Sequence, residues 1–171
     1  AEGKAIMGCA ITEPNAGSDI FSVRTRAVRA GDGYVINGSK QFITNGTIAD
    51  FLLVFCLTDP DAKKPTQRYS FLVIERDRPG FTARKLTGKM GIRASDTAEL
   101  FFDDVTVPAE NLVSATAGNG FAHVMHLFNI NRVIAAAQGV GVAQGALDRA
   151  VAYVRERSQF GAPLASFQGL Q

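Results

Sequence analysis

Two short stretches near the N-terminus hold the residue types that could bind an electron-rich ring. The first, residues 10–19 with the sequence AITEPNAGSD, joins an apolar run to a loop of small residues, hydroxyls and a proline. Such a loop leaves backbone N–H groups without intrachain partners and pointing outward. These donors suit an electron-rich heteroaromatic ligand or a developing negative charge. A plain polar turn is the alternative interpretation of the same residues.

The second stretch, residues 40–46 with the sequence KQFITNG, places an aromatic ring and a hydroxyl two positions apart. Phe42 and Thr44 would share one face of an extended strand, because strand side chains alternate with a period of two. A flavin needs both a stacking surface and a hydrogen-bond partner at its reactive nitrogen. Taken singly, a phenylalanine such as Phe42 is more often a core residue than a cofactor platform, so these residues alone leave both roles open.

Other arrangements that carry chemistry lack essential parts. His123 and His126 stand three apart on a predicted helix, but no carboxylate follows at helical spacing, so packing is predicted in place of a metal site. Gly139 and Gly141 lack the preceding strand and the third glycine of a dinucleotide fingerprint. No Gly-x-Ser-x-Gly motif and no Ser/His/Asp or Cys/His constellation is present, which argues against hydrolase chemistry.

The elements that must position these residues change character near residue 108. Before it, short apolar or alternating runs separated by turn residues predict an antiparallel β-sandwich or barrel. The predicted strands are residues 5–12, 23–30, 34–37, 40–44, 51–57, 69–75, 81–85 and 99–107. Asn37 and Gly38 are predicted to form a tight hairpin turn between two of them.

After Pro108 the pattern becomes helical. Residues 120–156 contain no proline and place apolar residues at helical spacing, which predicts one long helix. Glycines within it each cost about 1 kcal/mol relative to alanine, so close packing in a helix bundle is expected as compensation. Residues 159–164 end this helix, and Ser166 is predicted to cap a second one. The predicted class is α+β, with domains at residues 1–112 and 113–171.

Composition bounds the class of protein further. The 171 residues are 46% hydrophobic and 20% charged, and 18 basic and 16 acidic residues are mixed along the chain, which argues against nucleic-acid binding. No stretch approaches the roughly 20 apolar residues that span a bilayer. Cys9 and Cys56 have no metal-ligand spacing and are predicted to be buried free thiols, as in a cytoplasmic or mitochondrial-matrix protein. The missing initiator Met suggests a piece of a longer protein.

Four ordered motifs give the sequence a family resemblance. They are residues 12–19 (TEPNAGSD), 37–46 (NGSKQFITNG), 90–97 (MGIRASDT) and 102–108 (FDDVTVP). Together they resemble the acyl-CoA dehydrogenase family, and Arg132, Arg157 and Gln168 fit the same family in the same order. The resemblance covers nearly the whole chain. It implies a middle β-domain followed by the first long helix of a C-terminal four-helix bundle.

The resemblance implies FAD as cofactor and assigns residues to it. Ile11 and Thr12 would bind the pyrimidine edge of the flavin through backbone and hydroxyl groups. Phe42 matches the aromatic position that flanks the isoalloxazine, and Thr44 matches the hydroxyl near its N5, with Ile43 between them in the cofactor-binding strand. Many family members carry Trp where this chain has Phe42.

Further family positions imply contacts with substrate and with a neighbouring subunit. Ser18 matches a residue between cofactor and CoA pantetheine, and Asn129 and Arg132 match CoA contacts on the long helix. Several members carry Asp at the position of Asn129, which leaves acyl specificity open. The residues that would reach the FAD of a neighbouring subunit, in a homotetramer or dimer, are Arg157, Phe160 and Gln168.

The activity implied is FAD-dependent α,β-dehydrogenation of an acyl-CoA thioester, with electrons passed to an electron-transfer flavoprotein. It requires a carboxylate that removes the α-proton, while the cofactor accepts the hydride. The family places this base far along the C-terminal bundle or just before the arginine that matches Arg132. Here that second position is Asn131, an amide that cannot accept the proton. The base is therefore expected downstream of Gln171, and an acyl-CoA oxidase or a non-catalytic flavin-fold homologue are the alternatives.

Overall fold

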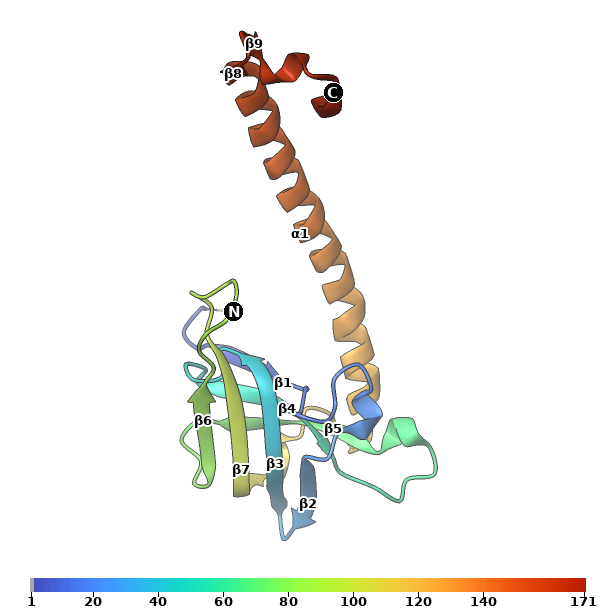
Figure 1. Cartoon of the computed structure of the whole chain (residues 1–171). Coiled ribbons are helices and arrows are strands. Elements are labelled where there is room, and N and C mark those ends of the chain that lie inside the picture. The colour runs from blue at the N-terminus through green and yellow to red at the C-terminus, as the bar shows by residue number, and fades with distance from the viewer. Residues whose placement is uncertain (1) are drawn as a thin grey trace. The chain divides into compact units, whose positions relative to one another are not determined.

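The computed structural model describes residues 2–171, which form two compact units that divide between Val124 and Met125 (Figure 1). The first unit contains a β-sheet and the second contains most of the long helix α1 (Gly120–Glu156). The α+β class predicted from the sequence is confirmed. The predicted domain boundary at residues 112–113 stays a prediction.

One seven-stranded sheet forms the first unit and curls into a half-barrel (Figure 1). Its order is β1-β4-β2-β3-β7-β6, and β5 pairs with β4 off this path. The strands are β1 (Met7–Ala10), β2 (Arg26–Ala30), β3 (Gly33–Thr44), β4 (Phe51–Leu57), β5 (Tyr69–Glu75), β6 (Phe81–Lys85) and β7 (Thr97–Pro108). Short 3₁₀ helices η1 (Ile20–Ser22), η2 (Pro65–Gln67) and η3 (Ala109–Asn111) lie in its connections.

The sheet is mixed, whereas the sequence pattern predicts a wholly antiparallel one. β1 runs parallel to β4, with Met7 opposite Phe51, and β2 meets β4 in parallel at a single pair, Arg26 and Leu57. The remaining pairings are antiparallel. An alternating pattern fixes which face of a strand is buried but not which neighbour the strand chooses, so the parallel edge is invisible in the sequence.

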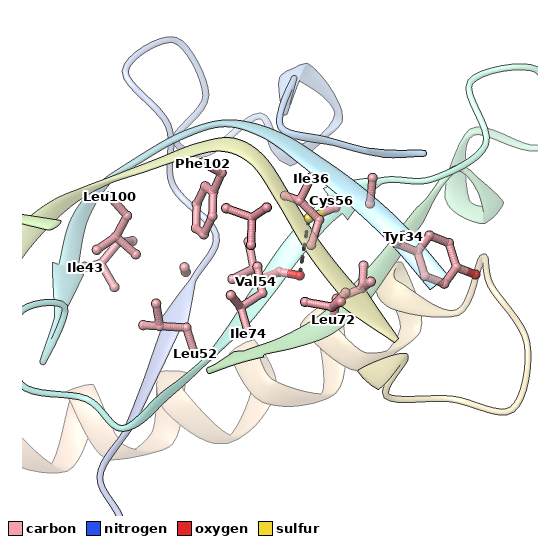
Figure 2. Packing of buried hydrophobic residues seen from close by; sticks show 14 of the residues in the cluster. Tyr34, Ile36, Ile43, Leu52, Val54, Cys56, Leu72, Ile74, Leu100 and Phe102 are labelled. Carbon is pink, nitrogen blue, oxygen red and sulfur yellow. Dashed lines mark hydrogen bonds between the residues drawn. The ribbon is translucent and has the colours of Figure 1, made fainter. Parts of the chain in front are cut away.

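The core lies inside the curl of this sheet (Figure 2). Ile36, Val54, Leu72 and Leu100 are fully buried and come from four different strands. Each such side chain contributes roughly 1.5–3 kcal/mol when removed from water. Cys56 belongs to the same cluster as a free thiol, and burial raises its pKa to about 12, so it remains protonated and unreactive.

Two β-bulges distort the pairing of β3 with β7. The register shifts between Ile36 and Gly38, where the extra residue lies on β7 and Asp104 adopts a φ of 51°. It shifts again between Lys40 and Ile43, where the extra residue lies on β3 and Phe42 adopts a φ of 61°. Bulges of this kind re-aim side chains and increase the local twist.

The predicted hairpin turn at Asn37 and Gly38 is wrong, because both residues lie inside β3 and the β2–β3 turn falls before Gly33. The Asn37 side-chain amide instead donates to the Asp104 carboxylate at 2.9 Å, and the Asp104 N–H donates to the Asn37 side-chain oxygen at 2.9 Å. Gly38, with a φ of 144°, is needed because a Cβ there would lie 2.6 Å from the Thr25 hydroxyl. Asn37 and Gly38 therefore stabilise the first bulge and do not form a hairpin turn.

In the second unit, α1 leads into a small hairpin. Strands β8 (Ser158–Gln159) and β9 (Ala162–Pro163) pair across Phe160 and Gly161, whose φ angles of 53° and 77° suit a tight turn. The 3₁₀ helices η4 (Leu164–Ser166) and η5 (Gln168–Leu170) follow. No helix within residues 2–171 is both long and apolar enough to cross a membrane.

The predicted N-cap at Ser166 is wrong. Ser166 is the last residue of η4, and its hydroxyl donates to the Pro163 carbonyl oxygen at 2.7 Å. A serine hydroxyl can bond backward to a nearby carbonyl as readily as forward to a helix N–H, so the residue type alone does not fix the direction.

Replacement of Gly38 tests the first bulge. We expect Gly38→Ala to lower the free energy of unfolding by about 2 kcal/mol, because the new methyl group meets the Thr25 backbone and the positive φ becomes strained. Urea unfolding of the purified protein measures the change. Gly91→Ala is the matched control, since a Cβ at Gly91 meets nothing within 4 Å. Equal stability of the two variants would show that the bulge relaxes freely.

Candidate functional site

The two stretches that the sequence singles out lie against each other in the first unit. The loop after β1 reaches β3, where the Gln41 N–H donates to the Thr12 carbonyl oxygen at 2.8 Å. The Lys40 ammonium donates to the Ile11 carbonyl oxygen at 2.9 Å. Residues 11–13 and 40–44 are therefore joined by direct hydrogen bonds, as a shared site requires.

A buried ion pair supports this junction. Lys40 Nζ lies 2.9 Å from the Glu13 carboxylate, and the side chains are 0% and 7% exposed. The same carboxylate accepts the Thr25 N–H at 2.9 Å and the Arg24 N–H at 2.8 Å. Glu13 is a structural residue here, because its oxygens are taken by donors within the chain.

This pair was not predicted from the sequence. The one signal available is the position of Lys40, which shares the inward phase of β3 with the buried Ile36. A charged group is almost never fully buried in a sheet unless an opposite charge compensates it. The identity of the partner, in a loop 27 residues earlier, does not follow from any local pattern.

The pKa values of Glu13 and Lys40 are both lowered, but for different reasons. Burial by itself raises the pKa of the Glu13 carboxyl, but Lys40 and the hydrogen bonds from Thr25 and Arg24 outweigh it, so that the pKa lies below its usual value. Burial lowers the pKa of Lys40, and its neighbours offset this only in part. Glu13 is therefore an anion at neutral pH and a poor proton acceptor.

The second bulge presents Phe42 and Thr44 to solvent. The Phe42 ring is 61% exposed, Thr44 is also exposed, and Ile43 between them is 2% exposed in the core. A left-handed backbone is unusual for a bulky residue such as Phe42 and indicates strain maintained by its surroundings. An exposed ring on a strained backbone is compatible with a ligand platform and not with core packing.

Asp96 secures the turn that follows Thr44. Its carboxylate accepts the Thr47 N–H at 2.8 Å and the Thr47 hydroxyl at 2.7 Å, and its carbonyl oxygen accepts the Asn45 N–H at 3.2 Å. Burial raises the pKa of Asp96, but the Thr47 hydrogen bonds outweigh it and lower the pKa overall. The acidic residue of the motif at residues 90–97 is thus an anchor for the candidate site.

The loop between Glu13 and η1 carries Ser18. Glu13 and Ala16 bond each other through both backbone groups, at 2.9 and 3.1 Å, which closes a tight turn around Pro14. Asp19 accepts the Phe21 N–H at 3.2 Å and starts η1. Ser18 is exposed between these two anchors, on the same loop as Thr12.

These residues fit a flavin. Within residues 2–171 the Thr12 N–H has no acceptor, and Thr12 is only half-buried, so this donor is accessible. The Phe42 ring supplies an apolar surface, and the exposed Thr44 hydroxyl supplies a hydrogen-bonding group two residues away. Donors at one edge and a ring on one face are what an isoalloxazine requires. The individual contacts with Ile11, Thr12, Phe42, Ile43 and Thr44 stay predictions.

The remaining predicted site residues belong to the second unit. Arg132 donates to the Asn129 side-chain oxygen at 2.5 Å, and both are exposed on α1. Phe160 is 95% exposed at the tip of the β8–β9 hairpin, edge-on to Phe167 with ring centroids 6.4 Å apart. Arg157 leads into this hairpin, and Gln168 begins η5. Their predicted roles toward CoA and a neighbouring subunit stay predictions.

Metal chemistry finds no support in the described part of the chain, where no three His, Cys, Asp or Glu side chains gather closely enough to hold an ion. His123 and His126 are exposed on α1.

Comparison with known families agrees with this geometry. Residues 8–105 match the acyl-CoA dehydrogenase middle domain, and residues 118–171 match the acyl-CoA dehydrogenase C-terminal domain. A cyclohex-1-ene-1-carbonyl-CoA dehydrogenase of Geobacter metallireducens is 48% identical over 99% of this chain and 44% of its own length. The chain belongs to the acyl-CoA dehydrogenase family. It spans about 44% of the length of this curated relative.

Solved structures of related proteins have the same fold. An acyl-CoA dehydrogenase from Geobacillus kaustophilus is 44% identical with a TM-score of 0.93, over 98% of this chain and 44% of that one. A glutaryl-CoA dehydrogenase from Mycobacterium smegmatis, solved in complex with FADH2, is 33% identical with a TM-score of 0.88, over 97% and 41%.

Proposed function

We propose that the full-length protein is an FAD-dependent acyl-CoA dehydrogenase. The observation that carries the proposal is the direct bonding of the Ile11–Thr12 loop to the strand that presents Phe42 and Thr44. Within residues 2–171 the Thr12 N–H has no acceptor, and Thr12 bonds Gln41, the neighbour of the exposed Phe42, in a chain of the acyl-CoA dehydrogenase family. The glutaryl-CoA dehydrogenase relative that binds FADH2 supports the choice of cofactor.

Flavin, when bound, supplies the hydride acceptor, and the protein supplies position and electrostatics. In the proposal Thr12 binds the pyrimidine edge, Phe42 flanks the ring system, and Thr44 donates near N5. The backbone on either side of Phe42 is fixed, since the hydrogen bonds of Asp96 hold the turn that follows and Lys40 holds the strand that precedes it. Ser18, Asn129 and Arg132 are assigned to CoA.

The electron acceptor is proposed to be an electron-transfer flavoprotein. A matching solved structure, 44% identical with a TM-score of 0.91, comes from work on the electron transferring flavoprotein of Acidaminococcus fermentans. The alternative is an oxidase, because a prolyl acyl carrier protein oxidase is also 35% identical with a TM-score of 0.87. Oxygen consumption by the reduced protein distinguishes the two activities.

Thr44 provides the first test of the flavin site. We expect Thr44→Val to shift the flavin absorption and to lower the reduction potential, because the hydroxyl that bonds near N5 is removed. Anaerobic spectral titration of the full-length protein measures both. Thr106→Val is the matched control, since Thr106 is also exposed in the sheet but pairs with Val35 at the other end of β3. Unchanged spectra and potential in Thr44→Val would exclude the contact.

Arg157 tests the contribution of a neighbouring subunit. We propose that Arg157 and Gln168 reach the FAD of another copy, because the chain leaves α1 after Glu156 and turns through the β8–β9 hairpin, which directs both residues away from the helix. Arg157→Ala should lose FAD at least tenfold more readily, which flavin content after gel filtration reports. Arg155→Ala, in the last turn of α1, is the control. Wild-type flavin retention by Arg157→Ala in both dimer and tetramer fractions would contradict the role.

The catalytic base is proposed to lie outside residues 1–171. Glu13 is unsuited to the task because three donors occupy its oxygens and its pKa is lowered, whereas a useful base has a pKa near the working pH. Position 131 is an asparagine. The full-length protein should reduce an artificial acceptor with an acyl-CoA thioester, and a downstream Glu→Gln variant should lose about 10²-fold or more of this rate.

Asp148→Asn serves as the control for that assay, because Asp148 bonds Gln144 on the exposed helix surface at 2.7 Å. Full activity in every downstream carboxylate variant, together with activity lost in Glu13→Gln, would move the base into this part of the chain. Absence of bound flavin and of thioester oxidation in the wild-type protein would refute the proposed function itself.

A further inference from the structure

One peptide unit connects the buried Lys40 ammonium to the free donor of the candidate site. Lys40 Nζ donates at 2.9 Å to the carbonyl oxygen of Ile11. The same peptide unit carries the Thr12 N–H, for which residues 2–171 offer no acceptor. The next peptide is also fixed, because the Thr12 carbonyl accepts the Gln41 N–H at 2.8 Å. Thr12 is thus held from both sides with its N–H available.

The charge on Lys40 acts strongly on this peptide. Hydrogen bonds from an ionised donor are roughly twice as strong as neutral ones. The Lys40 side chain is 0% exposed, and in a low local dielectric one hydrogen bond polarises the next. Withdrawal of electron density at the Ile11 oxygen makes the Thr12 N–H more positive. That N–H becomes a stronger donor toward an acceptor that gains negative charge.

Glu13 does not cancel this effect. Its carboxylate spreads its charge over three donors, of which Lys40 is only one, and the Thr25 and Arg24 N–H groups are the others. The Ile11 oxygen bonds Lys40 directly, whereas Glu13 is the second acceptor of the same ammonium. Glu13 therefore keeps the ammonium in place, and the Ile11 oxygen is the group of this peptide that contacts the positive charge directly.

We propose that Lys40 is a positioning residue that stabilises reduced over oxidised flavin through the Ile11–Thr12 peptide, with Glu13 holding it there. The inference rests on the proposed function, in which this peptide binds the flavin pyrimidine edge. Reduction of a flavin places negative charge on the pyrimidine ring, at N1 and the C2 carbonyl. A strengthened Thr12 donor therefore favours the reduced form and raises the reduction potential.

A purely structural role makes a different prediction. Replacing a buried ion pair by neutral residues of similar size is often harmless to stability, whereas removing one partner leaves an uncompensated charge. The double variant Lys40→Met with Glu13→Gln removes both charges at nearly constant volume. If the pair served packing alone, this variant would fold, bind FAD and keep the wild-type potential.

The experiment is a potentiometric titration of FAD in the full-length protein and in this double variant. We expect the double variant to retain flavin while its preference for reduced over oxidised flavin falls about tenfold, which shifts the two-electron potential by about 30 mV to more negative values. Lys63→Met is the control. Lys63 is exposed in the loop between β4 and η2, which carries none of the proposed flavin contacts, so the potential of this variant should match wild type.

The outcomes separate the two proposals. Wild-type protein without FAD overturns the proposed function and this inference together. Wild-type and double-variant proteins that both hold FAD at equal potentials overturn the inference alone. If the double variant does not fold, the C2 carbonyl stretch of isotopically labelled FAD in the wild-type protein decides. A frequency below that of FAD in water supports the strengthened donor, and a frequency at or above it refutes the inference.

Discussion

A lysine ammonium cannot be removed from water without compensation, and the compensation for Lys40 shapes the whole candidate site. Its two acceptors, the Ile11 carbonyl and the Glu13 carboxylate, both come from the loop after β1. The hydrogen bonds that compensate the Lys40 charge therefore hold that loop against β3. Glu13 in turn bonds the chain at Arg24 and Thr25 as it enters β2, so one buried charge fixes three separate segments. The Phe42 bulge begins directly after the lysine that organises them.

The two bulges of the long β3–β7 pair differ in how their strain is balanced. The one at Asp104 is closed by reciprocal hydrogen bonds with Asn37, so its strain is absorbed within the sheet. The one at Phe42 has no such closure by its own side chain, and the ring stays 61% exposed. Strained backbone that no local hydrogen bond from its own side chain offsets is often found at functional sites. The candidate ligand platform therefore lies at the second bulge.

Regular elements could be predicted from the sequence because their signals are local. Four elements have the predicted bounds, since each is a single uninterrupted pattern of apolar residues. They are the strands at residues 51–57, 69–75 and 81–85 and the helix at residues 120–156. Asn37-Gly38 was misleading because its partner, Asp104, lies 67 residues away. The long-range contact with Asp104 overrides the local turn preference, and a short stretch of sequence cannot reveal a contact between residues so far apart.

The residues of the candidate site could be proposed from the sequence, but the hydrogen bonds that hold them together could not. The resemblance of residues 12–19 and 37–46 to family motifs pointed to segments that the structure joins through Thr12 and Gln41. What remained hidden was the reason for the motif residues Glu13, Lys40 and Asp96, which bond the backbone of other segments. Backbone partners leave no trace in side-chain patterns, so anchors of this kind look like ordinary surface charges.

The parallel edge strand has a consequence for the order in which the domain can assemble. β1 lies at the end of the sheet and pairs with β4, and the Ile6 N–H reaches the Asp50 carboxylate 44 residues later in the chain. Contacts of such long sequence separation require loop closure before they give any stabilisation, which slows their formation. The loop that carries Thr12 continues directly from this strand. During synthesis, β1 therefore stays without its sheet partner until β4 has been made, and the proposed flavin site at Thr12 can form only after that closure.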